Sequence, residues 1–339
     1  MSLRPAHALR EQAPPHAGAR WLDGPEDERR LIGLLEACYG STYSHKHLYD
    51  VGSFQALWGE GRLASLGSFD DEGGALLGHT GLWFKDPEGD FAESGLSLME
   101  PRARLDPQRV HEAQAWPWLR ARLSEWVGAL HQNTTTLHAG AQLYALRHIG
   151  AQMSGLIPAY AEGESLLGLA APGATMHALT MTTPLRPIEA RRVCVPSTRL
   201  GGAWVAALAG SWGLEAEVVE PAADALAWTQ ELERAPGLGL VRRRAQVERR
   251  WAGEPLEATD ARVDLLHLPA RREEVAGLSA ALWGAGYVPV GLRLGFVRPH
   301  ELVWWRGRPS AEIAAQMVLA HPAWEAQVEA WTKLAALQR

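Results

Sequence analysis

Three histidines in the first quarter of the chain, His45, His47 and His79, are candidate bases or metal ligands, because imidazole exchanges protons near neutral pH. His45 and His47 are two residues apart, which would place both on one face of a strand. None of the three has the carboxylate or cysteine spacing of a metal site beside it, so we expect no metal. His45 and His47 are then expected to line the mouth of a site or to face water.

A dense basic run between Arg242 and Arg250 alternates with Val241, Ala245 and Val247. This pattern is typical of the solvated face of a strand; the alternative is a patch for an anionic partner. The formal net charge of -6 gives no overall attraction to nucleic acid or to an anionic membrane, and we expect neither as a partner. The Walker phosphate loop, the H-E-x-x-H zinc motif and the G-x-S-x-G nucleophile elbow are all missing.

The amino-acid composition is typical of a globular protein, with 47% apolar and 21% charged residues. Its 339 residues exceed what one hydrophobic core usually serves, so two domains are expected. Cys38 and Cys194 are too few for a disulfide framework. No stretch reads as a membrane span or a secretory signal, which predicts a cytoplasmic protein.

The first half alternates between helical and extended patterns. We expect residues 1–19 to be a flexible lead-in and a boundary to lie near Pro184 and Pro187. Asp106 followed by Pro107 predicts a helix start, with the helix running to about His131. The expected elements are a helix at 25–37, a hairpin of strands 62–69 and 75–84, a strand at 91–100, the helix from 107, a strand at 134–138, a short helix at 141–148 and strands 153–158 and 176–182. Their order predicts an α+β fold around a mostly antiparallel sheet.

A segment of the second half is similar in sequence to the end of the first half. The segment from Leu143 to Gly150, followed by Gly155-Leu156, has a counterpart in the segment from Leu278 to Gly286, followed by Gly291-Leu292. This weak internal similarity indicates a duplication. The last residues, 310–337, are expected to form two helical pieces separated at Pro322.

Several segments of the first half resemble a branch of the GNAT N-acetyltransferase superfamily over residues 20–187. The segments are Tyr39 to Asp50, Leu77-Gly78-His79, Ala92-Glu93-Ser94-Gly95, Glu100 to Arg104, and Leu137-His138-Ala139 through Gly150. The resemblance implies an α+β fold (α/β in broad classes) of the GNAT acyl-CoA N-acyltransferase type. It also implies that residues 188–339 are a degenerate second GNAT-like domain with C-terminal helices.

The resemblance further implies transfer of an acetyl group from acetyl-CoA to an amine, which is a small molecule or a peptide. The family grips the pyrophosphate with a glycine-containing loop at the start of the long helix, where bare backbone N–H groups meet phosphate oxygens. Arg104 stands at the first position of that motif, but Pro107 and Arg109 stand where small residues belong. Proline removes one N–H donor, and Asp106 as a helix cap places a carboxylate where the phosphates would lie.

Charged side chains can replace some of these backbone N–H groups as donors to the phosphates. Arg102, Arg104 and Arg109 are candidate phosphate partners. Leu98, Met99 and Pro101 are expected to flank the pantetheine arm of acetyl-CoA, in a gap between the strand that ends at Met99 and the strand at 134–138.

Glu93 stands where several family members keep a catalytic carboxylate, so it is the candidate general base; its alternative role is a salt-bridge partner. The family often has a tyrosine acid where this chain has Leu146, and Tyr144 lies about 200° away around the helix. We therefore keep two hypotheses. One is a GNAT-type N-acetyltransferase, and the other is a catalytically silent binding or regulatory protein that retains the fold.

Overall fold

The computed structural model describes residues 5–15, 18–70, 74–85, 90–105, 112–162, 175–222, 228–235, 240–247, 263–296, 298–306, 313 and 316–336. Their helices are α1 (Pro5–Arg10), α2 (Gly24–Tyr39), α3 (Ser53–Gly59), α4 (Glu112–Leu123), α5 (Gly140–Tyr144), α6 (Gly202–Ser211), α7 (Arg272–Gly284) and α8 (Pro322–Ala336). Their strands are β1 (Ala19–Trp21), β2 (Leu63–Phe69), β3 (Leu76–Trp83), β4 (Phe91–Met99), β5 (Ala129–Thr135), β6 (Gln152–Glu162), β7 (Thr175–Pro184), β8 (Arg192–Pro196), β9 (Glu215–Val219), β10 (Trp228–Ala235), β11 (Leu240–Val247), β12 (Val263–Pro269), β13 (Val288–Arg293) and β14 (Glu301–Arg306).

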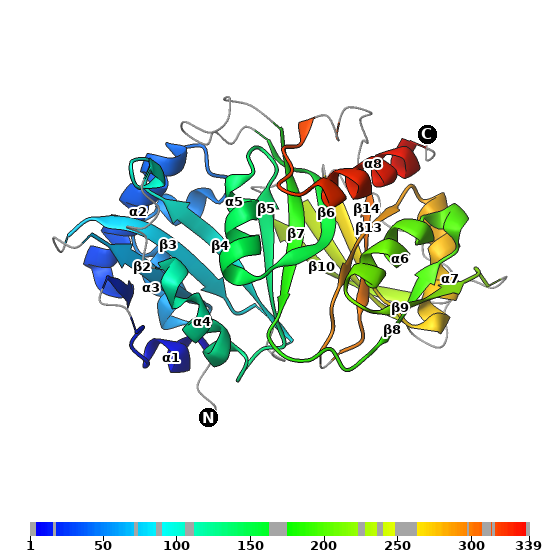
Figure 1. Ribbon diagram of the computed structural model, residues 1–339, viewed down its shortest axis with the longest axis horizontal. Helices are drawn as coiled ribbons and strands as arrows, with labels where there is room; N and C mark the ends of the chain where they lie inside the picture. Colours follow the sequence, from blue (N-terminus) through cyan, green and yellow to red (C-terminus); the bar gives the residue numbers. More distant parts are fainter. Residues whose placement is uncertain are drawn as a thin grey trace.

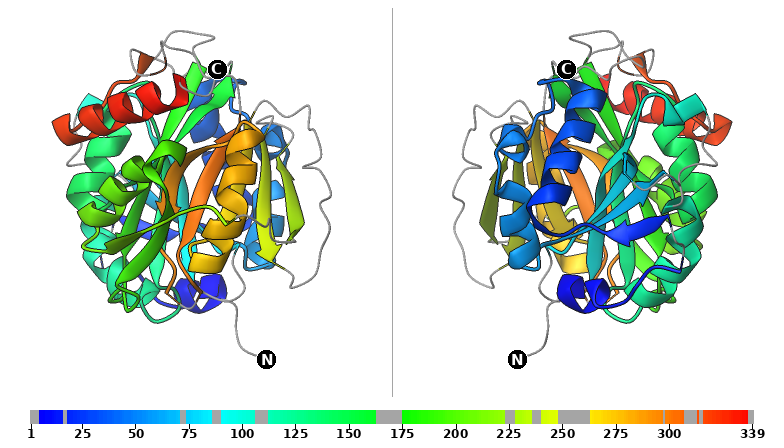
Figure 2. Two further views of the ribbon diagram at one scale, coloured as in Figure 1. Left: turned by 90° about the vertical axis from the view of Figure 1, so that its right-hand side faces the viewer. Right: turned by 90° about the vertical axis from the view of Figure 1, so that its left-hand side faces the viewer.

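Twelve of the described strands form one continuous sheet in the order β1-β2-β3-β4-β5-β7-β6-β13-β14-β12-β11-β10. Figure 1 shows the sheet passing from the first half on the left to the second half on the right. Helices α4, α5, α6 and α8 lie on one side of it (Figure 2). Helices α2 and α3 bury their apolar residues in a separate cluster with β2, β3 and β4. The mixed α+β fold expected from the sequence is confirmed.

The two halves of the sheet repeat one pattern of strand relations. In the first half β4 is parallel to β5, and β5-β7-β6 continue antiparallel. In the second half β11 is parallel to β12, and β12-β14-β13 continue antiparallel. The halves meet where β6 lies beside β13, with Gly155 opposite Gly291. The two glycines that the sequence echo paired are therefore neighbours on the approximate twofold axis of the sheet.

Glycine is needed at this junction because the backbones approach closely. A Cβ on Gly155 would lie 2.9 Å from the Gly291 Cα and 2.9 Å from the Val290 carbonyl oxygen. A Cβ on Gly291 would lie 2.9 Å from the Ser154 carbonyl oxygen and 3.0 Å from the Gly155 Cα. These reciprocal contacts are what a local twofold relation produces, and they are the reason that two small residues occupy equivalent positions.

A second contact joins the halves at the start of β4. The Asp90 carboxylate accepts hydrogen bonds from the backbone N–H of Phe296 (2.8 Å) and of Arg298 (3.3 Å). Asp90 is almost fully buried, and Gly128 lies against the Phe296 ring, where a Cβ would approach to 2.3 Å. The turn after β13 is thus fixed to the first half by backbone donors to a buried carboxylate.

Four expectations about local structure need correction. Residues 5–10 of the expected flexible lead-in form α1, which buries Ala6 and Leu9. The helix expected to reach His131 ends at Leu123, and residues 129–135 form β5. The segment with His45 and His47 forms a turn and a short 3-10 helix, η1 (Lys46–Tyr49), rather than a strand. Helix α8 begins at Pro322, and the described residues of the piece expected before it, 313 and 316–321, form no α-helix.

Candidate active site

The pairing of the parallel strands β4 and β5 ends part-way along their length, and we call the unpaired stretch beyond it the wedge. Their pairing joins Phe91 to Ala129, Ala92 to Leu130 and Glu93 to His131, although β4 continues to Met99 and β5 to Thr135. Beyond Glu93 the facing backbone groups of these two described strands do not pair with each other. Such groups need other partners, so the wedge can take an extended ligand between its strands.

A bulge in β4 accompanies the end of this pairing. Leu96 has a left-handed backbone conformation (φ 52°), and the register with β3 shifts between His79 and Gly81. The Nδ1–H of buried His79 donates to the Leu96 carbonyl oxygen over 2.8 Å, which holds the bulge from the β3 side. Burial lowers the pKa of His79 to about 4, so the ring is neutral at physiological pH. His79 therefore has a structural role at the wedge rather than that of a base.

The predicted cofactor residues gather at the end of β4. The Met99 carbonyl oxygen accepts from Arg104 Nε (3.2 Å) and from Cys38 Sγ (3.3 Å). Burial lowers the pKa of His138, and the charge of Arg104 adds to this effect. Arg104 follows β4 in a 3-10 turn, and its Nη2 donates to Cys38 Sγ over 3.7 Å. Leu98 packs in the apolar cluster with α2 and α3.

The rest of the expected pyrophosphate loop is only partly described. Arg102 is exposed beside Pro101, and its backbone N–H donates to the Glu100 carboxylate over 2.7 Å. Asp106, Pro107 and Arg109 lie outside the described residues. The assignment of this loop to phosphates stays a prediction.

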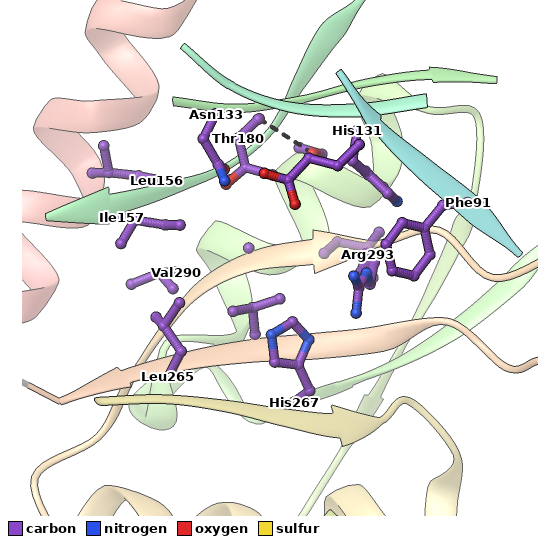
Figure 3. Close-up of a pocket in the computed structure, with 16 residues that line it drawn as sticks. Phe91, His131, Asn133, Leu156, Ile157, Thr180, Leu265, His267, Val290 and Arg293 are labelled. Atoms are coloured by element: carbon purple, nitrogen blue, oxygen red, sulfur yellow. Dashed lines mark hydrogen bonds between the residues drawn. The ribbon is translucent and has the colours of Figure 1, made fainter. Parts of the chain in front are cut away.

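Glu93 lies at the vertex of the wedge and lines a cavity of about 60 Å³. Its carboxylate is 2.9 Å from Lys85 Nζ, so the ion pair that the sequence kept as an alternative is present. Figure 3 shows that Asn133, His131 and Thr180 enter this cavity from the first half, opposite Leu265, His267 and Arg293 from the second half. The candidate base thus lies in a cavity that both halves build.

The cavity straddles the approximate twofold axis. If Gly155 is matched with Gly291, the strand registers match Asn133 with His267, His131 with Leu265 and Thr180 with Val303. All of these residues line the cavity. The two halves therefore contribute equivalent positions, but the first half carries more polar side chains there.

His131 is the most deeply buried titratable group of the cavity. Burial lowers its pKa to about 3, and the nearby charge of Arg293 acts in the same direction. Its Nδ1 lies 2.7 Å from Thr182 Oγ1, and its ring meets Phe91 edge-on with centroids 5.1 Å apart. Among the described residues, His131 Nε2 has no hydrogen-bond partner.

The second half supplies a compact charged group beside the cavity. Glu301 Oε2 lies 3.1 Å from His267 Nδ1 and 3.3 Å from Arg293 Nη1. The Arg293 guanidinium also stacks over the Phe91 ring, 3.7 Å from its centroid. The arginine is therefore held by a carboxylate on one strand and an aromatic ring on the other half.

Sequence reasoning missed His131, His267, Arg293 and Glu301. His131 was placed at the end of a helix, and the other three acquire a role only through the pairing of β6 with β13. The echo of Gly155 in Gly291 was the one signal that pointed to this junction.

The other candidates from the sequence lie elsewhere. His45 and His47 stack edge-on in the turn before α3, with ring centroids 5.9 Å apart. Tyr144 accepts a hydrogen bond from Trp116 Nε1 (2.7 Å), while Leu146 packs against an apolar cluster that both halves build. Within the described residues, no three histidine, cysteine or carboxylate side chains gather as metal ligands, and no helix is long and apolar enough to cross a membrane.

Comparison with known proteins gives structural likenesses only. No family model matches the chain, and no curated protein matches it in sequence. An aminoglycoside 6'-N-acetyltransferase solved with coenzyme A is 14% identical, aligns with 50% of this chain and 97% of its own, and has a TM-score of 0.33. The ribosomal-protein-S18-alanine N-acetyltransferase of Escherichia coli is 13% identical, with coverage of 50% and 94% and a TM-score of 0.37.

A GNAT-family acetyltransferase of Streptococcus pneumoniae is 12% identical, with coverage of 49% and 98% and a TM-score of 0.39. Each of these three solved acetyltransferases aligns with about half of the chain. The order of helices and strands from β1 to β7 is the mixed α+β order that the sequence resemblance implied.

Proposed function

We propose that the chain is an N-acetyltransferase that moves the acetyl group of acetyl-CoA to an amine. The observation that carries this proposal is the wedge between β4 and β5, with Glu93 at its vertex beside a cavity. An extended thioester arm laid between the two strands would reach the vertex with its acetyl group. A cytoplasmic location is part of this proposal.

Different residues of this chain would bind different parts of acetyl-CoA. The unpaired edges of β4 and β5 would hold the pantetheine arm by backbone hydrogen bonds, flanked by Leu98, Met99 and Pro101. Arg102, Arg104 and Arg109 would pair with the phosphates as charged donors and would offset the backbone N–H group that is missing at Pro107.

Glu93 would accept a proton from the incoming ammonium group, so that the neutral amine attacks the acetyl carbon and the thiolate leaves. The proposed acceptor, the Glu93 carboxylate, has its Oε2 2.9 Å from Lys85 Nζ.

Release of coenzyme A thiol, followed with a thiol reagent in the presence of a panel of amines, tests this proposal. The Glu93→Gln variant should reduce kcat by roughly 100-fold or more, the range of a lost general base. The matched control is Glu60→Gln, which removes an exposed carboxylate paired with Arg62. Equal rates for the Glu93→Gln variant and the parent would exclude Glu93 from the mechanism.

A silent binding protein is the second candidate. Leu146 stands where the resemblance implies a tyrosine acid, and Arg104 Nε already binds the Met99 carbonyl oxygen. In that case no amine would raise thiol release above the rate of spontaneous hydrolysis.

A further inference from the structure

The cavity between the halves has two unlike walls. The first-half wall carries the acceptor groups Glu93 and His131 with Asn133 and Thr180 beside the apolar Leu156 and Ile157, whereas the second-half wall has four aliphatic residues beside His267 and Arg293. The aliphatic residues of the second half are Leu265, Val290, Leu292 and Val303. A ligand that fits both walls has a polar end towards β4 and β5 and an apolar end towards β12, β13 and β14.

The proton arrangement of His131 follows from a chain of three contacts. Ser154 Oγ donates to the Thr180 carbonyl oxygen (3.2 Å), because a carbonyl can only accept. The Ser154–Thr182 contact (2.8 Å) then uses the one hydroxyl proton of Thr182. The Thr182–His131 contact (2.7 Å) therefore needs a proton on His131 Nδ1.

His131 is consequently a neutral ring whose Nε2 carries a lone pair and no proton. This atom is buried and has no partner within the described part of the chain, and His131 as a whole is only 7% exposed. A buried acceptor without a donor costs free energy, which a ligand with an N–H group would recover. The arrangement thus calls for a donor, not for a second acceptor.

The charges near the cavity favour a cation over an anion. Arg293 is the cation of the lining, but its guanidinium is held by Glu301 and by the Phe91 ring. Glu93 adds a carboxylate on the opposite wall, and its ion-pair partner Lys85 is an exposed residue outside the cavity lining. An ammonium group has three donors and a positive charge, and so it complements Glu93 and the bare Nε2 of His131.

We propose that this cavity is the acceptor site and that it binds a small primary alkylamine, with the ammonium group between Glu93 and His131 and the alkyl group against the second half. The amine as acetyl acceptor rests on the proposed function, whereas the binding of an ammonium ligand does not. The cavity volume of about 60 Å³ restricts the buried part of the ligand to a few heavy atoms. In this arrangement Thr182 and Ser154 are positioning residues, because they act through the tautomer of His131.

Titration of n-propylammonium chloride into the full-length protein tests the site, with n-propanol and propionate as ligands of similar size. We expect saturable binding of propylammonium only. In protein labelled with ¹⁵N-histidine, the signal of the unprotonated Nε2 of His131 should shift on binding while that of exposed His148 stays in place. Tighter binding of propionate, or an unchanged His131 signal at saturation, would overturn the proposal.

Variants separate positioning from packing. His131→Phe keeps a ring of similar volume without Nε2 and should weaken propylammonium binding at least 10-fold. Thr182→Val removes the acceptor of the Nδ1 proton and should weaken binding several-fold, while Thr182→Ser, which keeps the hydroxyl, should restore it. Equal affinity in Thr182→Val and Thr182→Ser would contradict the tautomer argument, and this pair decides the matter even if His131→Phe does not fold.

A parallel titration with acetyl-CoA keeps the two proposals distinguishable. Propylammonium binding without acetyl-CoA binding would support the cation site and refute the acetyltransferase. Acetyl-CoA binding without propylammonium binding would refute the cation site and leave the acetyltransferase standing.

Discussion

Substitution of Gly155 by alanine should destabilise the junction between the halves. The added Cβ would lie 2.9 Å from the Gly291 Cα and from the Val290 carbonyl oxygen, distances that real Cβ atoms almost never show. Both atoms belong to the backbone, so no side chain can rotate away, and β6 must move from β13. Overpacking of this kind costs about 1–3 kcal/mol, and we expect the upper end of that range.

The assay is chemical unfolding of the full chain, followed by tryptophan fluorescence and by circular dichroism. Gly33→Ala is the matched control, because Gly33 lies inside α2 with no atom within 4 Å of its would-be Cβ. Alanine there should raise the free energy of unfolding by about 0.5–1 kcal/mol, the helix preference of alanine over glycine.

The double variant Gly155→Ala/Gly291→Ala sharpens the test. Both substitutions force apart the same two backbones, so the second should cost less than the first. A Gly155→Ala protein as stable as the parent, or strictly additive losses in the double variant, would refute the close-packed junction.

Three further predictions concern residues that shape the wedge and its supports. Asp90→Ala removes the acceptor of the Phe296 N–H and should lower the free energy of unfolding by about 1–3 kcal/mol in the same assay, because buried donors lose their partner; no loss would contradict the role of this contact. Glu28→Ala should lower it by a similar 1–3 kcal/mol, since the buried Glu28 Oε1 accepts from the backbone N–H groups of Gly52 and Phe54 at the start of α3 and alanine leaves both without this acceptor; circular dichroism at equal denaturant would report the loss. His79 has a folded pKa of about 4, below its unfolded value, so its neutral form is bound more tightly in the fold and stability should fall as pH drops below about 6.5. Between pH 7 and pH 5 this one histidine should account for about 2 kcal/mol, and His79→Gln should reduce the pH dependence by that amount; an unchanged dependence would mean that His79 is not neutral and buried.

Much of the first half could be predicted from local patterns. The helix before Gly40 and the hairpin of β2 and β3 have clear periods and turns. The start of β5 could not, because nearly every residue from Ala129 to Gln132 is buried and a strand buried on both faces loses its alternation. Apolar residues at helical spacing also follow the end of α4 at Leu123, and so the sequence predicted one helix up to His131.

The site depended on information that no local pattern holds. Glu93 was found through a resemblance, and its role as a base stays a prediction; in the structure it lies where the pairing of β4 with β5 ends. His131, Arg293 and His267 meet only because β6 pairs with β13, a contact between residues more than a hundred positions apart. The repeated glycines predicted a duplication, which stays a prediction, but not that the two halves would line one cavity.

The second half differs from the first where the wedge opens. In the first half the parallel pairing ends at Glu93 opposite His131, whereas the equivalent pairing of β11 with β12 continues for two more residues, to Arg244 opposite His267. Strands β11 and β12 are therefore still paired at the positions equivalent to those where the pairing of β4 with β5 has ended.

A calorimetric titration of acetyl-CoA into the full-length protein tests the central claim, that the wedge between β4 and β5 holds the acetyl donor. We predict saturable heat with one molecule bound per chain and a matching thermal stabilisation. Neither heat nor stabilisation at millimolar acetyl-CoA, or two molecules bound per chain, would contradict this account.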